Sequence, residues 1–266
     1  MHPLLTTAIT AAREAGDFIM TQYGAPDITM KGDHSPVTQA DMGAHDRILE
    51  SLRTTNIPVL SEESGDTEFP TLPYPDTLWI VDPLDGTKDF INMSGDFSVM
   101  IGLLEKGEPT LSVVYAPHHR TLYFAARDKG AYMEKDGKEQ RLRVGTRTSP
   151  DLRFICSKNH FTPYMDAIAE KLIVSTSTPH GSVGIKASML GRDEGDFFFY
   201  TVALGVWDVC APQLIATEAG GTVTDIHGEP LTYTTTNHRL SNGVVFSNTA
   251  CHTEVITALH TTPVPL

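Results

Sequence analysis

The pattern of apolar and polar positions divides the chain into two parts. Near the start, apolar residues recur at helical spacing and charged residues fall between them, which predicts an amphipathic helix over about residues 4–19. A second helix is predicted to begin at Thr38 and to carry Ala44, Ile48 and Leu52 on one face. Short apolar runs separated by turn residues then follow up to about residue 133, which is typical of a largely antiparallel sheet.

Beyond about residue 146, predicted strands and helices alternate. Short β-branched and aromatic runs predict strands at 154–156, 173–174, 196–200, 222–224 and 243–246. Longer stretches between them predict helices near 164–172, 183–190, 207–219 and 254–259. Such alternation is the mark of an α/β unit. We therefore predict an α/β protein with an α+β half at residues 1–145 and an α/β half at residues 146–266.

The charge of the chain limits its partners. A formal net charge of −13 makes nucleic acid or an anionic membrane an unfavourable partner, and a small phosphorylated substrate would need metal ions to supply local positive charge. Three scattered cysteines are too few for a disulfide framework or a zinc site, and they indicate a reducing compartment. No apolar run is long enough to span a bilayer, and the N-terminus lacks a signal-peptide pattern. We expect a cytoplasmic protein.

The most informative stretch is Leu78–Phe90, with the sequence LWIVDPLDGTKDF. Four apolar residues predict a buried strand, and Asp82 and Asp85 follow it. Pro83 favours an extended Asp82 at the strand end, while Gly86 permits a tight turn that can open a helix and attract an anion. Two carboxylates beside such a turn would repel a phosphate unless a cation lies between them, and oxygen ligands of this kind suit Mg²⁺.

Each acidic residue in this pattern also has an ordinary structural explanation. Asp-Gly is a common turn signal, and Asp41 stands where it would complete a capping box with Thr38. Asp208 opens another predicted helix and would complement its dipole. For Asp41 taken alone, the capping interpretation is the better one. Acidic residues nevertheless occur at four separate strand ends or helix starts, which favours a common site; they are Asp41, Glu62, the Asp82 and Asp85 pair, and Asp208.

Four segments, in this order, resemble the inositol monophosphatase superfamily, a group of Mg²⁺-dependent, lithium-sensitive phosphatases. They are Ser35–Asp41 (SPVTQAD), Ser61–Ser64 (SEES), Trp79–Thr87, and Trp207-Asp208 with Glu218–Gly221 (EAGG). The resemblance covers nearly the whole chain, and its Asp-Pro-Leu-Asp-Gly-Thr block is highly specific. It implies a layered αβαβα sandwich with the site between the two halves.

The resemblance also implies roles for individual residues. The positions that match metal ligands, for two or three Mg²⁺ ions, are Glu62, Asp82, the backbone carbonyl of Leu84, Asp85 and Asp208. Thr87 and Asp41 match the pair that orients and deprotonates the attacking water, and Glu62 joins them in the catalytic set. The positions that would contact substrate are Gly86, Thr87, Lys88, Ser182, Gly184, Lys186 and Asp208. This is the arrangement of two-metal phosphoryl transfer.

Within the superfamily, Lys88-Asp89-Phe90 is similar to the form found in 3′(2′),5′-bisphosphate nucleotidases, as are Val113–Pro117 (VVYAP) and Lys186. The chain departs from that branch at Val183, which stands where a second Ser is usual, and at residues 202–206, which lack the usual Gly-Pro-Thr. It departs from inositol phosphatases at Thr201, which replaces a Glu that binds inositol hydroxyls. Loss of such an acceptor argues against inositol as the preferred substrate.

These features predict a Mg²⁺-dependent phosphatase that removes the 3′-phosphate of adenosine 3′,5′-bisphosphate, or of its sulfated form, to give AMP and phosphate. An inositol or sugar monophosphatase of broad specificity is the alternative among enzymes. Outside them, the alternative is a metal-binding regulator without turnover, which the Asp41 and Thr87 pair disfavours because binding alone needs no residues that activate water. The sequence leaves the oligomeric state open, a homodimer included.

Overall fold

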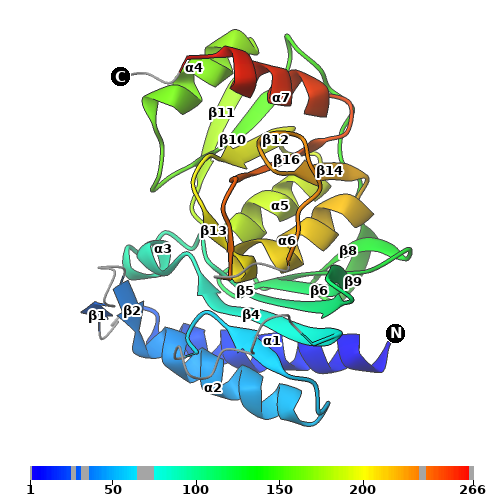
Figure 1. The fold of residues 1–266 in the computed structure, drawn as a ribbon. Helices are drawn as coiled ribbons and strands as arrows, with labels where there is room; N and C mark the ends of the chain where they lie inside the picture. Colours follow the sequence, from blue (N-terminus) through cyan, green and yellow to red (C-terminus); the bar gives the residue numbers. More distant parts are fainter. Residues whose placement is uncertain (1, 25–27, 31–35, 65–74, 234–237, 264–266) are drawn as a thin grey trace.

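The computed structural model describes the whole chain except residues 1, 25–27, 31–35, 65–74, 234–237 and 264–266. The described helices and sheets stack in five layers (Figure 1). The helices of the first layer are α1 (Pro3–Gln22) and α2 (Gln39–Arg53), those of the middle layer are α5 (Val183–Gly191) and α6 (Val206–Glu218), and those of the last are α4 (Pro163–Lys171) and α7 (His252–Thr261). One sheet lies in each gap between helix layers, which confirms the predicted αβαβα sandwich.

The first sheet has seven described strands in chain order, which are β3 (Val59–Ser61), β4 (Thr77–Asp85), β5 (Ser98–Glu105), β6 (Glu108–Ala116), β7 (Thr121–Ala126), β8 (Gly130–Lys135) and β9 (Lys138–Arg141). Only β3 and β4 run parallel to each other, so the predicted largely antiparallel sheet is confirmed. The central strands are buried almost throughout because helices cover both faces. A hairpin of β1 (Ile28–Met30) and β2 (Pro36–Thr38) precedes α2.

The second sheet has the described order β11 (Thr176–His180), β10 (Arg153–Ser157), β12 (Phe197–Tyr200), β16 (Val244–Asn248) and β14 (Gly221–Thr224). Strand β10 pairs in parallel with β11 and β12, whereas β16 pairs antiparallel with β12 and β14. A separate short pair joins β13 (Leu204–Gly205) to β15 (Arg239–Leu240). The alternation of strands and helices predicted for this part is confirmed.

The strand predicted at 173–174 is wrong. Ile173 has a φ of +51° and is 62% exposed, in the turn that follows α4. The strand begins at Thr176 instead. It forms there because it pairs with β10, although its residues are mostly polar. Strand β9 was not predicted because all four of its residues are exposed and polar.

The core forms on both faces of the seven-stranded sheet. One apolar cluster joins the sheet to α1 and α2, a smaller one lies beneath α6, and the largest joins α5 and α6 to the five-stranded sheet. Helix α5 is buried at all nine positions because it lies between two sheets. The three cysteines, Cys156, Cys210 and Cys251, are free thiols buried in this second part.

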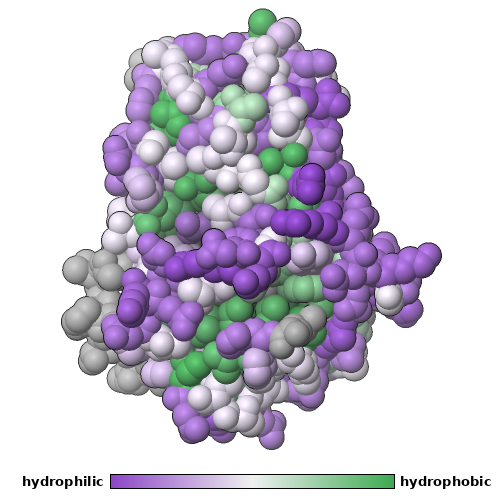
Figure 2. Space-filling model, turned by 90° about the vertical axis from the view of Figure 1, so that its right-hand side faces the viewer, coloured by the Kyte–Doolittle hydropathy of each residue, from purple (hydrophilic) through white to green (hydrophobic). Residues whose placement is uncertain are grey.

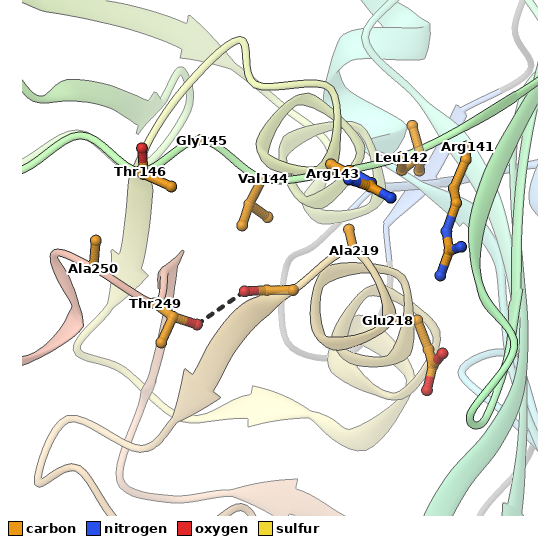
Figure 3. A pocket seen from close by; sticks show the side chains of 11 residues that line it. Arg141, Leu142, Arg143, Val144, Gly145, Thr146, Glu218, Ala219, Thr249 and Ala250 are labelled. Atoms are coloured by element: carbon orange, nitrogen blue, oxygen red, sulfur yellow. Dashed lines mark hydrogen bonds between the residues drawn. The ribbon is translucent and has the colours of Figure 1, made fainter.

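The two parts are also joined at the C-terminal end of α6, through the connection that follows β9 (Figure 3). Val144 N–H donates to Ala219 O at 3.0 Å, and Thr249 Oγ1 donates to Gly220 O at 2.9 Å. A hollow of about 390 Å³ opens there, with Arg141 and Glu218 on its wall. The predicted division at residue 145 falls in this connection and stays a prediction.

On the face shown in Figure 2, hydrophilic and hydrophobic residues are interspersed, and a hydrophilic band crosses the middle. Mixed surfaces of this kind are normal for a folded protein in water. Among the described residues, no helix has the length and apolar character needed to cross a bilayer.

Candidate functional site

The predicted strand, turn and helix around Asp82 and Asp85 are confirmed. Strand β4 continues through Asp85, and its pairing with β5 shifts register between the two aspartates, which turns both carboxyls to one place. Leu84 N–H donates to Asp82 Oδ1 at 3.0 Å. Gly86 then adopts a φ of +96° and opens α3 (Thr87–Ile91). A Cβ at Gly86 would meet the carbonyl oxygen of Asp96 at 2.7 Å, so this turn requires glycine.

Asp41 fills the capping role and a second role together. Its Oδ2 accepts from Thr38 N–H at 2.7 Å and from Thr38 Oγ1 at 2.6 Å, which completes the capping box of α2. Its Oδ1 accepts from Thr87 Oγ1 at 2.9 Å, across 46 residues of sequence. Burial, opposed by these hydrogen bonds, raises the pKa of Asp41, so its carboxylate is a stronger base than an exposed one. The two residues predicted to act as a pair are therefore in contact.

Asp85 is held by the second part of the molecule. Ser182 Oγ and Gly184 N–H both donate to its Oδ2, the latter at 2.9 Å. Ser98 is the first residue of β5, and its Oγ lies 2.9 Å from Ser182 Oγ. Burial raises the pKa of Asp85 even though these hydrogen bonds and the charge of Lys186 act to lower it. The sequence did not lead us to predict Ser98 as a site residue, although a polar residue at the start of an apolar run can indicate a polar contact at a strand end.

The remaining carboxylates surround Asp82. Glu62 follows β3 and its N–H donates to Val81 O at 3.0 Å, while Asp208 is the third residue of α6 and accepts from Gly205 N–H at 2.7 Å. Burial, and then the charges of Glu62, Asp85 and Asp208, raise the pKa of Asp82 well above its ordinary value. Burial, and then the charges of Glu62 and Asp85, do the same for Asp208. Four carboxylates from three distant parts of the chain therefore repel one another at one place.

This donor set fits a hard divalent cation. It offers only oxygen atoms, and a cation would reverse the repulsion that raises these pKa values. Within the described residues, the carboxylates are near enough to interact by charge, but no three His, Cys, Asp or Glu side chains are gathered closely enough to hold a metal ion by themselves. Mg²⁺ usually takes waters and substrate oxygens as further ligands.

The other predicted substrate contacts differ in exposure. Lys88 is exposed beside the Gly86 turn. Lys186 is 1% exposed, and its Nζ donates to the carbonyls of His180 at 3.2 Å and Gly181 at 2.9 Å. The Leu84 carbonyl lies 3.2 Å from Thr87 Oγ1. The predicted site residues thus lie at strand ends or at the starts of helices α2, α3, α5 and α6, and their individual roles stay predictions.

Comparison with known proteins agrees with this geometry. A model of the "Inositol monophosphatase family" matches residues 1–262. The chain is 37% identical over 245 residues to the 3′(2′),5′-bisphosphate nucleotidase CysQ of Salmonella typhimurium, covering 90% of this chain and 98% of that protein. It is 30% identical over 262 residues to the Nus factor SuhB of Escherichia coli, covering 93% and 92%. The crystal structure of CysQ from Bacteroides thetaiotaomicron superposes with a TM-score of 0.76 at 31% identity, covering 92% of this chain and 96% of that one.

Proposed function

The chain belongs to the inositol monophosphatase family of phosphatases, and we propose that within it the protein hydrolyses the 3′-phosphate of adenosine 3′,5′-bisphosphate to give AMP and phosphate. The observation that carries the proposal is the set of four mutually repelling carboxylates beside the Asp41 and Thr87 contact. The choice of substrate is supported by the 37% identity to a bisphosphate nucleotidase and by the Lys88-Asp89-Phe90 sequence.

In this proposal, Mg²⁺ is held by Glu62, Asp82, Asp85, Asp208 and the carbonyl of Leu84. When bound, Mg²⁺ supplies two things, a water of lowered pKa and stabilisation of the leaving oxygen. The chain itself provides a proton acceptor, which is Asp41. Thr87 Oγ1 donates a hydrogen bond to Asp41 Oδ1, so the lone pairs of the Thr87 hydroxyl are free to accept a hydrogen bond from a water. Because burial raises the pKa of Asp41, that carboxylate is suited to take up the proton.

The test is phosphate release from adenosine 3′,5′-bisphosphate, inositol 1-phosphate and fructose 1,6-bisphosphate side by side, with Mg²⁺ and then with EDTA. We expect a preference for the nucleotide of about a hundredfold in kcat/KM, or about 2.7 kcal/mol of transition-state binding. Comparable rates on all three would favour the broad-specificity alternative. No release from any of them would contradict the proposal.

Asp85→Asn and Asp46→Asn form a matched pair of variants for the same assay. Asp85 is buried against Ser182, whereas Asp46 is exposed on α2. We expect the first to remove turnover, by about a thousandfold, and the second to leave it within about twofold. Persistent hydrolysis in Asp85→Asn would show that the metal ligands are assigned incorrectly.

The alternative outside enzymes is a metal-binding regulator, and the relative named as a Nus factor gives it one specific support. A regulator needs no Asp41 base. Turnover by the wild-type protein therefore separates the two, and Asp41→Asn then tests the base: the proposed enzyme should lose turnover but keep Mg²⁺ binding. Inhibition by millimolar Li⁺ is a further expectation from the family resemblance.

A further inference from the structure

Asp89 lies beside the site without a role in the proposed chemistry. It is the third residue of α3, two positions after Thr87, and only 1% of it is exposed. A carboxylate this buried needs hydrogen-bonding or charged partners. Ser94 Oγ donates to its Oδ1 at 2.7 Å, Asn159 Nδ2 donates to its Oδ2, and Lys158 Nζ lies 3.2 Å from Oδ1.

Two of these partners come from the opposite part of the molecule. Lys158 and Asn159 directly follow β10, about 70 residues further along the chain. Lys158 Nζ also donates to Asp96 at 3.3 Å, and the other Asp96 oxygen lies 3.1 Å from His180 Nδ1. Lys158 N–H donates to the carbonyl of His180 at 3.1 Å. Asp89 therefore connects α3 to the end of β11.

The next residue after His180 shows how closely the two parts approach. A Cβ built on Gly181 would lie 1.8 Å from Asp89 Oδ2, so the carboxylate packs directly against the backbone at this glycine. Gly181 begins the turn that carries Ser182 and Gly184, the two groups that donate to Asp85. The position of Asp89 thus limits how near that turn can come to Asp85.

We propose that Asp89 is a positioning residue that sets the separation between the Gly86 turn and the Gly181–Gly184 turn. Through that separation it places Ser182 and Gly184 against Asp85, and so tunes metal binding and substrate binding at a carboxylate it does not touch. Both the length and the charge of the Asp89 side chain matter, because a longer side chain would push the turn away and a neutral one would leave Lys158 paired with Asp96 alone. The inference deepens the proposed function and rests on it.

Asp89→Asn keeps the size of the side chain, but it removes the charge and brings an amide N–H against Lys158 or Asn159. We expect Mg²⁺ binding, measured by calorimetry without substrate, to weaken about tenfold, and kcat/KM on the nucleotide to fall by about tenfold or more. Asp166→Asn, which removes an exposed charge near the start of α4, is the matched control and should change neither value.

A second pair of variants tests the steric part. Gly181→Ala should weaken Mg²⁺ binding because the new methyl group meets the Asp89 carboxylate. Asp89→Gly removes the atoms that this methyl group meets, so the double variant should bind Mg²⁺ no more weakly than Asp89→Gly alone. Asn159→Ala removes one donor that lies on an exposed loop, and it should weaken Mg²⁺ binding in the same direction as Asp89→Asn.

A merely structural role for Asp89 would lower Tm and leave Mg²⁺ affinity, kcat and KM of the folded protein unchanged. That result, in both Asp89→Asn and Asn159→Ala, would overturn the inference. If the wild-type protein binds Mg²⁺ but hydrolyses none of the three phosphate esters, the proposed function fails by itself. The calorimetric affinities of the variants still decide the role of Asp89.

Discussion

Helix α6 has a carboxylate near each end, and the two are held in opposite ways. At its C-terminal end, both oxygens of Glu218 accept main-chain N–H groups, from Asp128 at 2.8 Å and from Gly130 at 2.7 Å. Near its N-terminal end, Asp208 accepts the N–H of Gly205, but it faces the charges of Glu62 and Asp85, and its pKa is raised well above the ordinary value. The carboxylate at one end is satisfied by hydrogen bonds, whereas the carboxylate at the other end is repelled by its neighbours.

The middle of α6 connects these ends and fits tightly against the seven-stranded sheet. Ser112 Oγ donates to Ala211 O at 2.7 Å, and Cys210 packs over Gly102 of β5. Pro212 lies inside the helix and removes the hydrogen bond that the carbonyl of Asp208 would otherwise accept within it. The comparison teaches that the same helix holds one carboxylate by main-chain hydrogen bonds at its C-terminal end and holds another against like charges in its first turn, where we propose the metal site. We make four predictions that test this difference between the two ends of α6, in decreasing order of expected effect.

Asp208→Asn should have the largest effect on activity and a small one on stability. Turnover should fall about a thousandfold because a proposed metal ligand is lost. The Tm of the metal-free protein should stay the same or rise, because one of four mutually repelling charges disappears. Initial rates with Mg²⁺ and thermal melts in EDTA test this, and a clear drop in Tm would contradict the comparison.

Adding Mg²⁺ to the wild-type protein should raise its Tm. At a hundred times the Kd, binding to the folded state alone contributes about 2.7 kcal/mol. For a chain of this size that corresponds to a shift of about 5 °C or more. The same titration on Asp208→Asn should give a much smaller shift, whereas Glu218→Gln should respond as the wild type does.

Gly102→Ala should reduce stability through the middle of α6. The added Cβ would lie 2.6 Å from Cys210 Sγ and 3.2 Å from Ala211 N, so the helix or the thiol must move. Overpacking of this kind costs about 1–3 kcal/mol. The double variant Gly102→Ala, Cys210→Ala should recover part of the loss in denaturant unfolding, because the new methyl group takes the place of the sulfur.

Glu218→Gln should lower stability modestly and leave turnover unchanged. The amide can satisfy only one of the two N–H groups at Asp128 and Gly130, and loss of one charge-assisted bond costs about 1–2 kcal/mol. Glu170→Gln, an exposed change on α4, is the matched control. A lowered kcat in Glu218→Gln at unchanged Mg²⁺ affinity would mean that the two ends of α6 are coupled.

Local patterns were enough to predict much of the fold. Helices α1 and α2 could be predicted from the amphipathic spacing of their own residues, and the turn at Gly86 from the residues next to it. Strand β11 could not be predicted, because Thr176–His180 is mostly exposed and forms a strand through pairing with β10. The acidic candidates were found because each stands at a strand end or helix start.

The partners of those candidates were out of reach of local patterns. Ser182 and Gly184 reach Asp85 across 97 and 99 residues, and nothing in spacing fixes which oxygen they bond. The contact between Asp89 and Asn159 joins two parts whose relative placement comes only from packing of the layers. The order of the motifs along the chain was enough to predict the candidate residues, whereas the hydrogen bonds between them follow only from the three-dimensional structure.

The three buried thiols could report on unfolding of the second part of the molecule. Cys156 lies on β10, Cys210 on α6 and Cys251 at the start of α7, and burial raises the pKa of each thiol, for Cys251 to about 12. Because alkylating reagents attack the exposed thiolate, each cysteine reacts only when its own layer opens. The order in which the three sites become labelled would then record the sequence in which sheet, central helix and outer helix come apart, without any added probe.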